Sequence, residues 1–246
     1  DDLYTPTKNG VVMTVTRQTP KKEYRLVYDN KGSVTSFQSG SDIDENYTIY
    51  DGSFFTDIND NYWFVGQIDD YNNDREDVNL LFNTSKKTWE RNNKWGLAYN
   101  DWYFTDGTYS YKVFKSGSTH KIQRWNGSGW DAEINYMKYD ESGRGTDCAY
   151  NVNNILKYDD GSIELIWGKN RWYWNQTNMS WLYKGTYTDK DGNDYLAMYG
   201  HNHLPLYVDG VLTDCCIVNK VNGAEYSYYI AILNKYSGIF TRIIPL

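Results

Sequence analysis

The chain has 246 residues, among them 25 tyrosines and 10 tryptophans, and it carries a formal net charge of −7. So aromatic a composition excludes a disordered chain. The acidic balance, without any long run of Lys or Arg, argues against binding to nucleic acid or to an anionic membrane surface, and no apolar run reaches the roughly 18 residues of a membrane span.

Short segments rich in β-branched and aromatic residues recur along the whole chain, whereas no apolar stripe of helical period exceeds two turns. In chain order the clearest are GVVMTVT, EYRLVYD, NYWFVGQ, VNLLFN, YSYKVFK, HKIQRWN, SIELIWG, RWYWNQ, YLAMYG, LPLYVDG and YSYYIAIL. Asn, Asp, Gly and Ser separate them, and such residues favour hairpin turns because they tolerate positive φ. The sequence therefore predicts an all-β fold of short strands and tight turns.

A hairpin pattern recurs in which a strand ends in an Asn turn and a tryptophan follows. LLFNTSKKTW ends on Trp89, QRWNGSGW on Trp130 and WYWNQTNMSW on Trp181, so these tryptophans are 41 and 51 residues apart. A period of about 40 to 50 residues, with four strands in each repeat, is typical of β-propellers. We therefore expect RWNGSGWDAE to be a hairpin leading to the outermost strand of a blade, with Trp125 and Trp130 packed between neighbouring blades.

The segments FNTSKKTW and WNQTNMSW resemble kelch-type propeller repeats, in which a strand ends in a Tyr-Asp or Tyr-Asn turn and a tryptophan follows about six residues later. The double-glycine motif of that family is absent from every repeat, so the resemblance implies a fold more than an activity. We predict one β-propeller domain over residues 1–246, with five or six four-stranded blades and with the two termini sharing a blade. The alternative is a two-sheet β-sandwich.

Three further patterns concern cysteines and metal ligands. Because Cys148, Cys215 and Cys216 form an odd set, we expect them to be reduced rather than disulfide-bonded. His201 and His203 alternate along a segment, so both imidazoles would face one side, and a third ligand would have to come from Asp194 or His120. We expect a polar loop rather than a metal site here.

Oxygen-bearing side chains at alternate positions, the spacing that suits Ca²⁺, occur in three loops. These loops are Asp42-Asp44-Asn46, Asp57-Asn59-Asn61 and Asp189-Asp191-Asn193. None has the glutamate that closes an EF-hand loop, so we expect ordinary turns and no cofactor. Ca²⁺ held by Asp189, Asp191 and Asn193 is the alternative.

Three carboxylates recur near the starts of successive candidate inner strands, in the contexts YDG, YND and YDDG. They are Asp51, Asp101 and Asp159. Five-bladed propellers that process arabinan and fructan carry three Asp or Glu residues at the central cavity, and two carboxylates that flank a sugar bond can serve as acid and as base or nucleophile. The similarity to these glycosidases implies a catalytic role for the three aspartates. A repeated turn would give the same recurrence.

The surplus of Tyr, Trp, Asn and Asp is typical of sugar-binding sites and of protein interfaces. Loops longer than their hairpins require carry several of these residues, and binding residues concentrate on such loops. Our candidates for ligand contacts are Trp95, Trp102, Tyr71, Arg75 and Arg144, which combine a loop setting with side chains that anchor interfaces.

These patterns favour a non-catalytic binding module that contacts a glycan or a protein surface through loops on one propeller face. The first alternative is a structural or adhesion subunit of a larger assembly, such as a viral tail or a cell-surface complex. The second is a glycoside hydrolase with carboxylates at the propeller axis. All three interpretations fit an extracellular, cell-surface or virion location.

Overall fold

The structure is a computed structural model, and it describes residues 3–6, 12–18, 22–28, 34–36, 48–59, 61–69, 74–83, 85–86, 88–158, 160–197, 204–208, 211–222 and 225–246. In these ranges the chain is all-β: strands are joined by turns, and the single helical segment is the short 3₁₀ helix η1 (Ala149–Asn154). The predicted all-β class is therefore confirmed. Within the described ranges we find no helix with the length and apolar character needed to cross a membrane.

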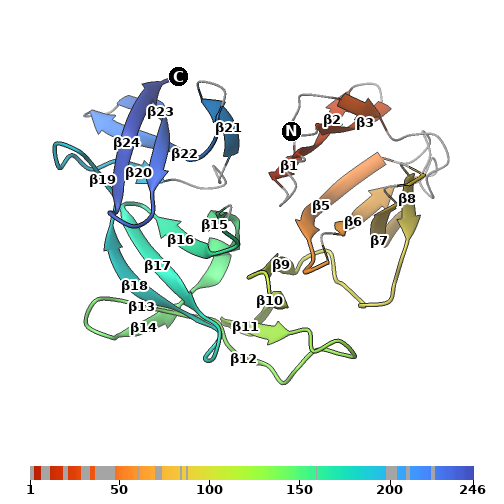
Figure 1. The fold of residues 1–246 in the computed structure, drawn as a ribbon. Helices are drawn as coiled ribbons and strands as arrows, with labels where there is room; N and C mark the ends of the chain where they lie inside the picture. The colour runs from red at the N-terminus through yellow and green to blue at the C-terminus, as the bar shows by residue number, and fades with distance from the viewer. Residues whose placement is uncertain are drawn as a thin grey trace. The chain divides into compact units, whose positions relative to one another are not determined.

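Contacts divide the chain into two compact units, the first formed by Asp1–Phe114 and Gln123–Ala132 and the second by Lys115–Ile122 and Glu133–Leu246. The first unit contains two four-stranded sheets, ordered β1-β2-β3-β4 and β5-β6-β7-β8, in which every strand pairs antiparallel with the next (Figure 1). Their strands are β1 (Leu3–Pro6), β2 (Val12–Gln18), β3 (Lys22–Tyr28), β4 (Val34–Ser36), β5 (Thr48–Thr56), β6 (Tyr62–Asp69), β7 (Arg75–Asn83) and β8 (Thr88–Arg91).

The next sheet keeps the same consecutive order, β12-β11-β10-β9. Its strands are β9 (Trp102–Thr105), β10 (Ser110–Ser116), β11 (Thr119–Arg124) and β12 (Ile134–Asn135). Four strands paired in chain order are typical of a propeller blade.

The first sheet of the second unit has the order β14-β13-β18-β17-β16-β15. A four-stranded antiparallel meander of β15 to β18 forms most of it. The hairpin β13–β14 extends this sheet, since β13 pairs in parallel with β18. Its strands are β13 (Met137–Tyr139), β14 (Gly145–Asp147), β15 (Ile155–Lys157), β16 (Ile163–Trp167), β17 (Asn170–Asn175) and β18 (Ser180–Thr186).

The last sheet departs from this order. It reads β19-β24-β23-β22-β20, with β21 also paired to β22, so two different strands share one long partner. Its strands are β19 (Thr188–Asp189), β20 (Leu196–Ala197), β21 (Leu204–Val208), β22 (Val211–Asn222), β23 (Glu225–Asn234) and β24 (Ile239–Pro245).

The sheets are those of a β-propeller with four blades, and the expected number of five or six is wrong. Three of the five sheets have consecutive strand order, and a fourth contains the consecutive meander β15 to β18, whereas the strands from Thr188 onward combine irregularly around β22. The sequence-based count assigned every turn-separated strand to a four-stranded blade. It is too high here because the short strands β20 and β21 both pair with the one long strand β22. In the described ranges the first and the last strands of the chain belong to separate sheets.

The hairpin at Trp125 to Trp130 confirms the turn expected from RWNGSGWDAE. The two tryptophans pair across the turn, the Asn126 amide donates to the Gly129 carbonyl at 3.0 Å, and Asn126 Oδ1 accepts the amides of Ser128 and Gly129. Both indoles pack on a buried cluster of the first unit. That cluster is Phe55, Trp63, Val65, Trp95, Leu97 and Tyr103. The predicted structural role of these tryptophans is therefore confirmed.

Candidate functional site

A hollow of about 490 Å³ opens on the surface of the second unit. Its wall is built from the turn after β13, the turn between β17 and β18, and β18 itself. The lining residues are Tyr139, Asp140, Glu141, Gly143, Asn178, Ser180, Leu182 and Tyr183. We call this feature the Tyr139 hollow.

Strand pairing brings residues about forty positions apart in sequence into this wall. Tyr139 on β13 lies opposite Leu182 on β18, and Figure 1 shows the β13–β14 hairpin alongside β18. Because side chains alternate along a strand, Ser180 and Leu182 face the same side of β18. The sheet thus presents one face of β18 to the hairpin turn.

The hairpin turn is held by its own first residue. Asp140 Oδ1 accepts the hydroxyl of Ser142 at 2.7 Å and the amides of Ser142 at 3.0 Å and Arg144 at 2.9 Å. Gly143 has a φ of +79°, a left-handed conformation that glycine adopts without steric cost. The hydrogen bond from the Ser142 hydroxyl, followed by that from the Arg144 amide, lowers the pKa of Asp140 below its ordinary value. The Asp140 carboxylate is therefore ionised at neutral pH and gives the turn a negative charge at the rim of the hollow.

Two half-buried tyrosines supply aromatic walls, and Trp172 supports both. The indole N–H of Trp172 donates to the Tyr139 carbonyl at 2.9 Å, and the Tyr183 ring meets the Trp172 ring edge-on with centroids 6.1 Å apart. The ring of Tyr139 lies so close to Gly145 that a Cβ there would be 2.9 Å from Cε1 of the tyrosine. The glycine thus leaves room for the tyrosine ring.

Ser180 lies in the wall with only 3% of its surface exposed, and its Oγ has no hydrogen-bond partner among the residues that the structure describes. A buried hydroxyl without a partner costs about 1–3 kcal/mol. The oxygen itself is inaccessible to solvent, so a molecule in the hollow does not reach it in this conformation.

Of the residues predicted to contact ligand, Arg144 belongs to this hairpin and is exposed beside the hollow. Trp102, half-buried, begins β9, and Arg75 begins β7 and pairs with Asp69 at 3.2 Å; both belong to the first unit. Tyr71 lies outside the described residues.

Trp95 is buried rather than exposed on a loop, so the setting predicted for it is wrong. Its ring stacks on Trp125 at 5.0 Å and on Trp63 at 5.4 Å, and its carbonyl accepts the indole N–H of Trp130 at 3.1 Å. Burial of four large rings against one another outweighs the polar context WERNNKWG in which Trp95 stands.

Among the three carboxylates predicted at the propeller axis, the structure describes only the side chain of Asp101. Asp159 and the side chain of Asp51 lie outside the described part, so their convergence stays a prediction. Burial raises the pKa of Asp101, while the nearby Lys112 ammonium and the Tyr103 hydroxyl oppose that shift. The Lys112 ammonium lies 5.0 Å from the centroid of the Trp130 ring.

The candidate Ca²⁺ loop at Asp189 is an Asx turn in the structure. Asp189 Oδ1 accepts the amides of Asp191 at 2.9 Å and Asn193 at 2.8 Å, and Oδ2 accepts the Asn193 side-chain amide at 2.8 Å. Asp57 likewise accepts from Asn59 and Asn61. Both carboxylates thus face N–H donors, and within the described part of the chain no group of three or more His, Cys, Asp or Glu side chains has the arrangement to hold a metal ion.

Of the other metal ligands considered from the sequence, the structure describes His120 and Asp194, and each has a partner of its own. His201, His203 and the third Asx loop at Asp42 lie outside the described residues. His120 Nδ1 lies 2.8 Å from Asp147 Oδ2, and Asp194 pairs with Lys169 at 2.7 Å. The three cysteines are free, and all three are buried.

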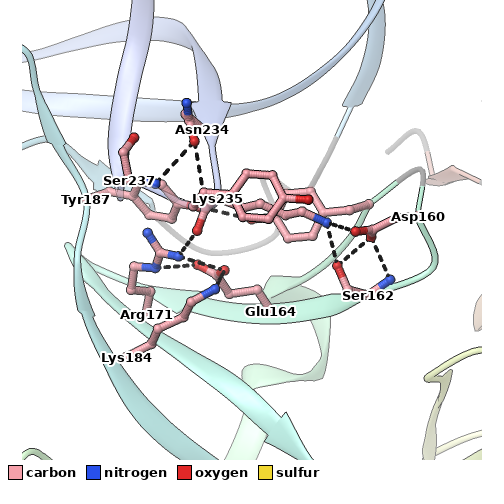
Figure 2. Close-up of polar contacts among 11 residues, drawn as sticks. Asp160, Ser162, Glu164, Arg171, Lys184, Tyr187, Asn234, Lys235 and Ser237 are labelled. Atoms are coloured by element: carbon pink, nitrogen blue, oxygen red, sulfur yellow. Dashed lines mark hydrogen bonds and ion pairs between the residues drawn. The ribbon is translucent and has the colours of Figure 1, made fainter.

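A buried ionic network occupies another part of the second unit (Figure 2). Arg171 Nε on β17 lies 2.8 Å from Glu164 Oε1 on β16, and the Lys184 ammonium on β18 lies 3.2 Å from Glu164 Oε2. Arg171 also donates to the Lys235 carbonyl in the β23–β24 turn. Burial raises the pKa of Glu164, and Arg171 and then Lys184 oppose that shift. The network joins three strands to this turn.

The side chain of Lys235 continues the network. Its ammonium pairs with Asp160, contacts Ser162 Oγ at 2.8 Å and lies 4.8 Å from the centroid of the Tyr158 ring. The Tyr158 hydroxyl in turn lies 3.0 Å from that of Tyr187. We interpret this array as an anchor for the β23–β24 turn, because its charges pair with one another.

Comparisons with known proteins support the fold. No family model matches the sequence and no curated protein matches it. A solved structure described as "RS223-Beta-xylosidase" matches at 11% identity with a TM-score of 0.50, covering 100% of this chain and 94% of that chain. The "Dos1 propeller" matches at 6% identity with a TM-score of 0.32, covering 94% and 57%, which is too weak to carry an argument. The sheets themselves show a β-propeller-like arrangement, whereas kelch-type repeats remain a prediction.

Sequence reasoning missed most of the hollow. Within the segment KYDESGRGTD only Arg144 was predicted to contact a ligand, and Tyr139 was not singled out. Asn178, Ser180 and Tyr183 stand in WNQTNMSWLYK, where the tryptophan spacing indicated only a structural hairpin. Ser180 gave no sequence signal of a site, because its burial depends on the neighbouring β13–β14 hairpin.

Proposed function

We propose that this protein is a non-catalytic glycan-binding module and that the Tyr139 hollow is its binding site. The observation that carries the proposal is the coincidence in one hollow of two half-buried tyrosines, two carboxylates and the exposed Asn178. A ring face covers the C–H surface of a sugar, while carboxylate, amide and hydroxyl groups bond its hydroxyls.

The dimensions of the site favour a glycan over a protein partner. A hollow of about 490 Å³ has the size of a small-ligand site. A stable protein interface needs about 800 Å² on each partner, with apolar anchors at its centre. Among the large exposed apolar side chains of the described residues, only Tyr226, Tyr228 and Leu246 lie together, at one end of the β23–β24 pair. The full set is Ile58, Ile134, Tyr173, Tyr226, Tyr228, Tyr236 and Leu246.

The proposal is tested by screening a glycan array with the purified chain and measuring hits by calorimetry. Tyr183→Ala removes one aromatic wall, and we expect it to weaken binding about tenfold or more. The matched control is Tyr236→Ala, which removes a tyrosine that is 86% exposed in the β23–β24 turn. Absence of any glycan hit, or equal loss in the two variants, would exclude the hollow as a glycan site.

A glycoside hydrolase is the second candidate, and Asp101 is the observation that favours it. A general acid in glycoside hydrolysis needs a raised pKa, and burial raises the pKa of Asp101. The fold match to a structure described as a β-xylosidase makes an aryl β-xyloside the first substrate to try.

Hydrolysis would appear as release of the aryl group, and Asp101→Asn should abolish it. Asp77→Asn is the control, because Asp77 is an exposed aspartate on β7 of the same unit. Activity that survives in Asp101→Asn would remove Asp101 from the mechanism, and lack of activity in the unmodified protein would leave the binding function.

A further inference from the structure

We propose that Asn126 is a site of spontaneous modification, at which the backbone amide of Gly127 attacks the asparagine side chain and converts it into aspartate or isoaspartate. The inference is independent of the proposed glycan-binding function, because it concerns the hairpin at Trp125 to Trp130 in the first unit. Two observations carry it: a turn that recurs in four hairpins of the described chain, and the residue that follows the asparagine in each of them.

In these four hairpins an asparagine closes the turn with its own side chain. Its Oδ1 accepts the backbone amides of the second and third residues that follow it, at 3.0 to 3.2 Å. N–H donors at a carbonyl oxygen stabilise the negative charge that develops there when a nucleophile attacks the carbon. The four side chains therefore share the same polarised amide. They are Asn83, Asn126, Asn175 and Asn234.

The residue after the asparagine distinguishes Asn126 from the other three. Gly127 follows it, whereas Thr84, Gln176 and Lys235 follow the others. Glycine has no Cβ beside the attacking nitrogen, and its backbone turns freely; the φ of Gly127 is already +99°. The Gly127 amide donates to no acceptor among the described residues, and both residues are exposed to water. Ring closure is therefore easier at Asn126 than in the other three turns.

The reaction needs water and no other reagent. The Gly127 nitrogen forms a bond to Cγ of Asn126, and its proton passes through solvent to Nδ2. The bond between Cγ and Nδ2 breaks, ammonia leaves, and a cyclic imide remains. Water then adds to one of the two imide carbonyls and opens the ring. Opening at Cγ restores the original backbone with an aspartate, and opening at the backbone carbonyl gives isoaspartate.

The product places a second carboxylate beside Asp131. In the unmodified hairpin Asn126 Nδ2 donates to Asp131 Oδ1 at 2.9 Å, and this hydrogen bond, followed by that from Arg124, lowers the pKa of Asp131. The new side chain has no N–H to donate and meets like charge, while Arg124, 3.0 Å from Asp131 Oδ2, compensates one of the two charges. The modification thus weakens the hairpin that carries Trp125 and Trp130.

The experiment incubates the purified chain in mildly alkaline buffer and follows each turn asparagine by peptide mapping with mass spectrometry. We expect aspartate and isoaspartate to form at Asn126 about tenfold faster or more than at the other three, which are controls within the same sample. Conversion at Asn126 that is equal to theirs or slower would overturn the proposal. Gly127→Ala should slow conversion at Asn126 by a similar factor, and an unchanged rate would exclude attack by this amide. If that variant does not fold, the comparison within the unmodified chain decides.

Asn126→Asp tests the effect on the hairpin separately, because it creates one of the two products directly. Its melting temperature should be lower than that of the unmodified chain by about 1–4 °C. Asn175→Asp is the matched control: it keeps the oxygen that accepts the Thr177 amide, and Asn175 Nδ2 has no acceptor to lose among the described residues. Equal melting temperatures of the two variants would overturn the predicted coupling to Asp131.

Discussion

Replacing Arg171 by methionine is the sharpest test of the network in Figure 2, because it removes one partner of a buried ion pair and keeps a long side chain. The side chains of Glu164 and Arg171 are only 2% and 3% exposed. Without Arg171, Glu164 keeps only Lys184, whose side chain is 36% exposed and therefore better hydrated. The Lys235 carbonyl also loses its donor, and Tyr187 loses a guanidinium 4.2 Å from its ring centroid.

Breaking a buried pair from one side costs about 3–5 kcal/mol, because the remaining charge is left uncompensated. For a chain of this length each kcal/mol lowers the melting temperature by about 2–4 °C, so we expect a decrease of about 6–20 °C. Lys169→Met is the control. The pair of Lys169 with Asp194 is 45% and 48% exposed, and such surface pairs contribute about 0–1 kcal/mol.

The loss of unfolding free energy in Arg171→Met should be smaller at low pH than at neutral pH. Burial already raises the pKa of Glu164, and removal of Arg171 raises it further. An acid whose pKa is higher in the folded than in the unfolded state binds its proton more tightly when folded. Proton binding by Glu164 therefore contributes to the free energy of unfolding. This contribution is fully present below the ordinary pKa of 4.5 and is lost as the pH rises through the pKa of the folded state. Urea unfolding of Arg171→Met should therefore show a smaller loss at pH 4 than at pH 7.

A loss under about 1 kcal/mol at pH 7, equal to that of Lys169→Met, would refute the buried pairing. The double variant Glu164→Gln, Arg171→Met supplies the second check. Since it removes both charges, it should be more stable than Arg171→Met alone.

Three further predictions concern turns. Gly238→Ala should lower the unfolding free energy in urea by about 1–2 kcal/mol or more, since φ is +70° and the new Cβ would lie 2.7 Å from Arg171 Nη1; a neutral effect would contradict the geometry. Asp57→Ala should cost about 1–3 kcal/mol by calorimetry, because Trp63 Nε1 then loses its buried acceptor at 2.9 Å, and Asp57→Asn should recover part of the loss. Chelator should leave the melting temperature unchanged, because the oxygens of Asp189 already accept N–H groups; a decrease reversed by Ca²⁺ would identify a calcium site.

The sequence was most informative where local chemistry decides the structure. The turn at Asn126 and the packing of Trp125 and Trp130 could be predicted, because an Asn-Gly-Ser-Gly turn closes on itself and two indoles must be buried. The exposed loop setting of Arg144 could be predicted for a similar local reason, and its role in binding stays a prediction. Trp95 was misplaced, because its polar neighbours in sequence conceal the three tryptophans that cover it.

By itself the sequence determined an all-β chain of propeller type, since alternating strands and Asx-Gly turns are local properties with a fixed period. Only the tertiary structure decided the number of blades, because β20 and β21 both pair with β22 and no local pattern encodes such a partner choice. The hollow was decided in the same way. Tyr139 meets Leu182 through a parallel pairing between distant segments, and that pairing is what places Ser180 in the wall of the site.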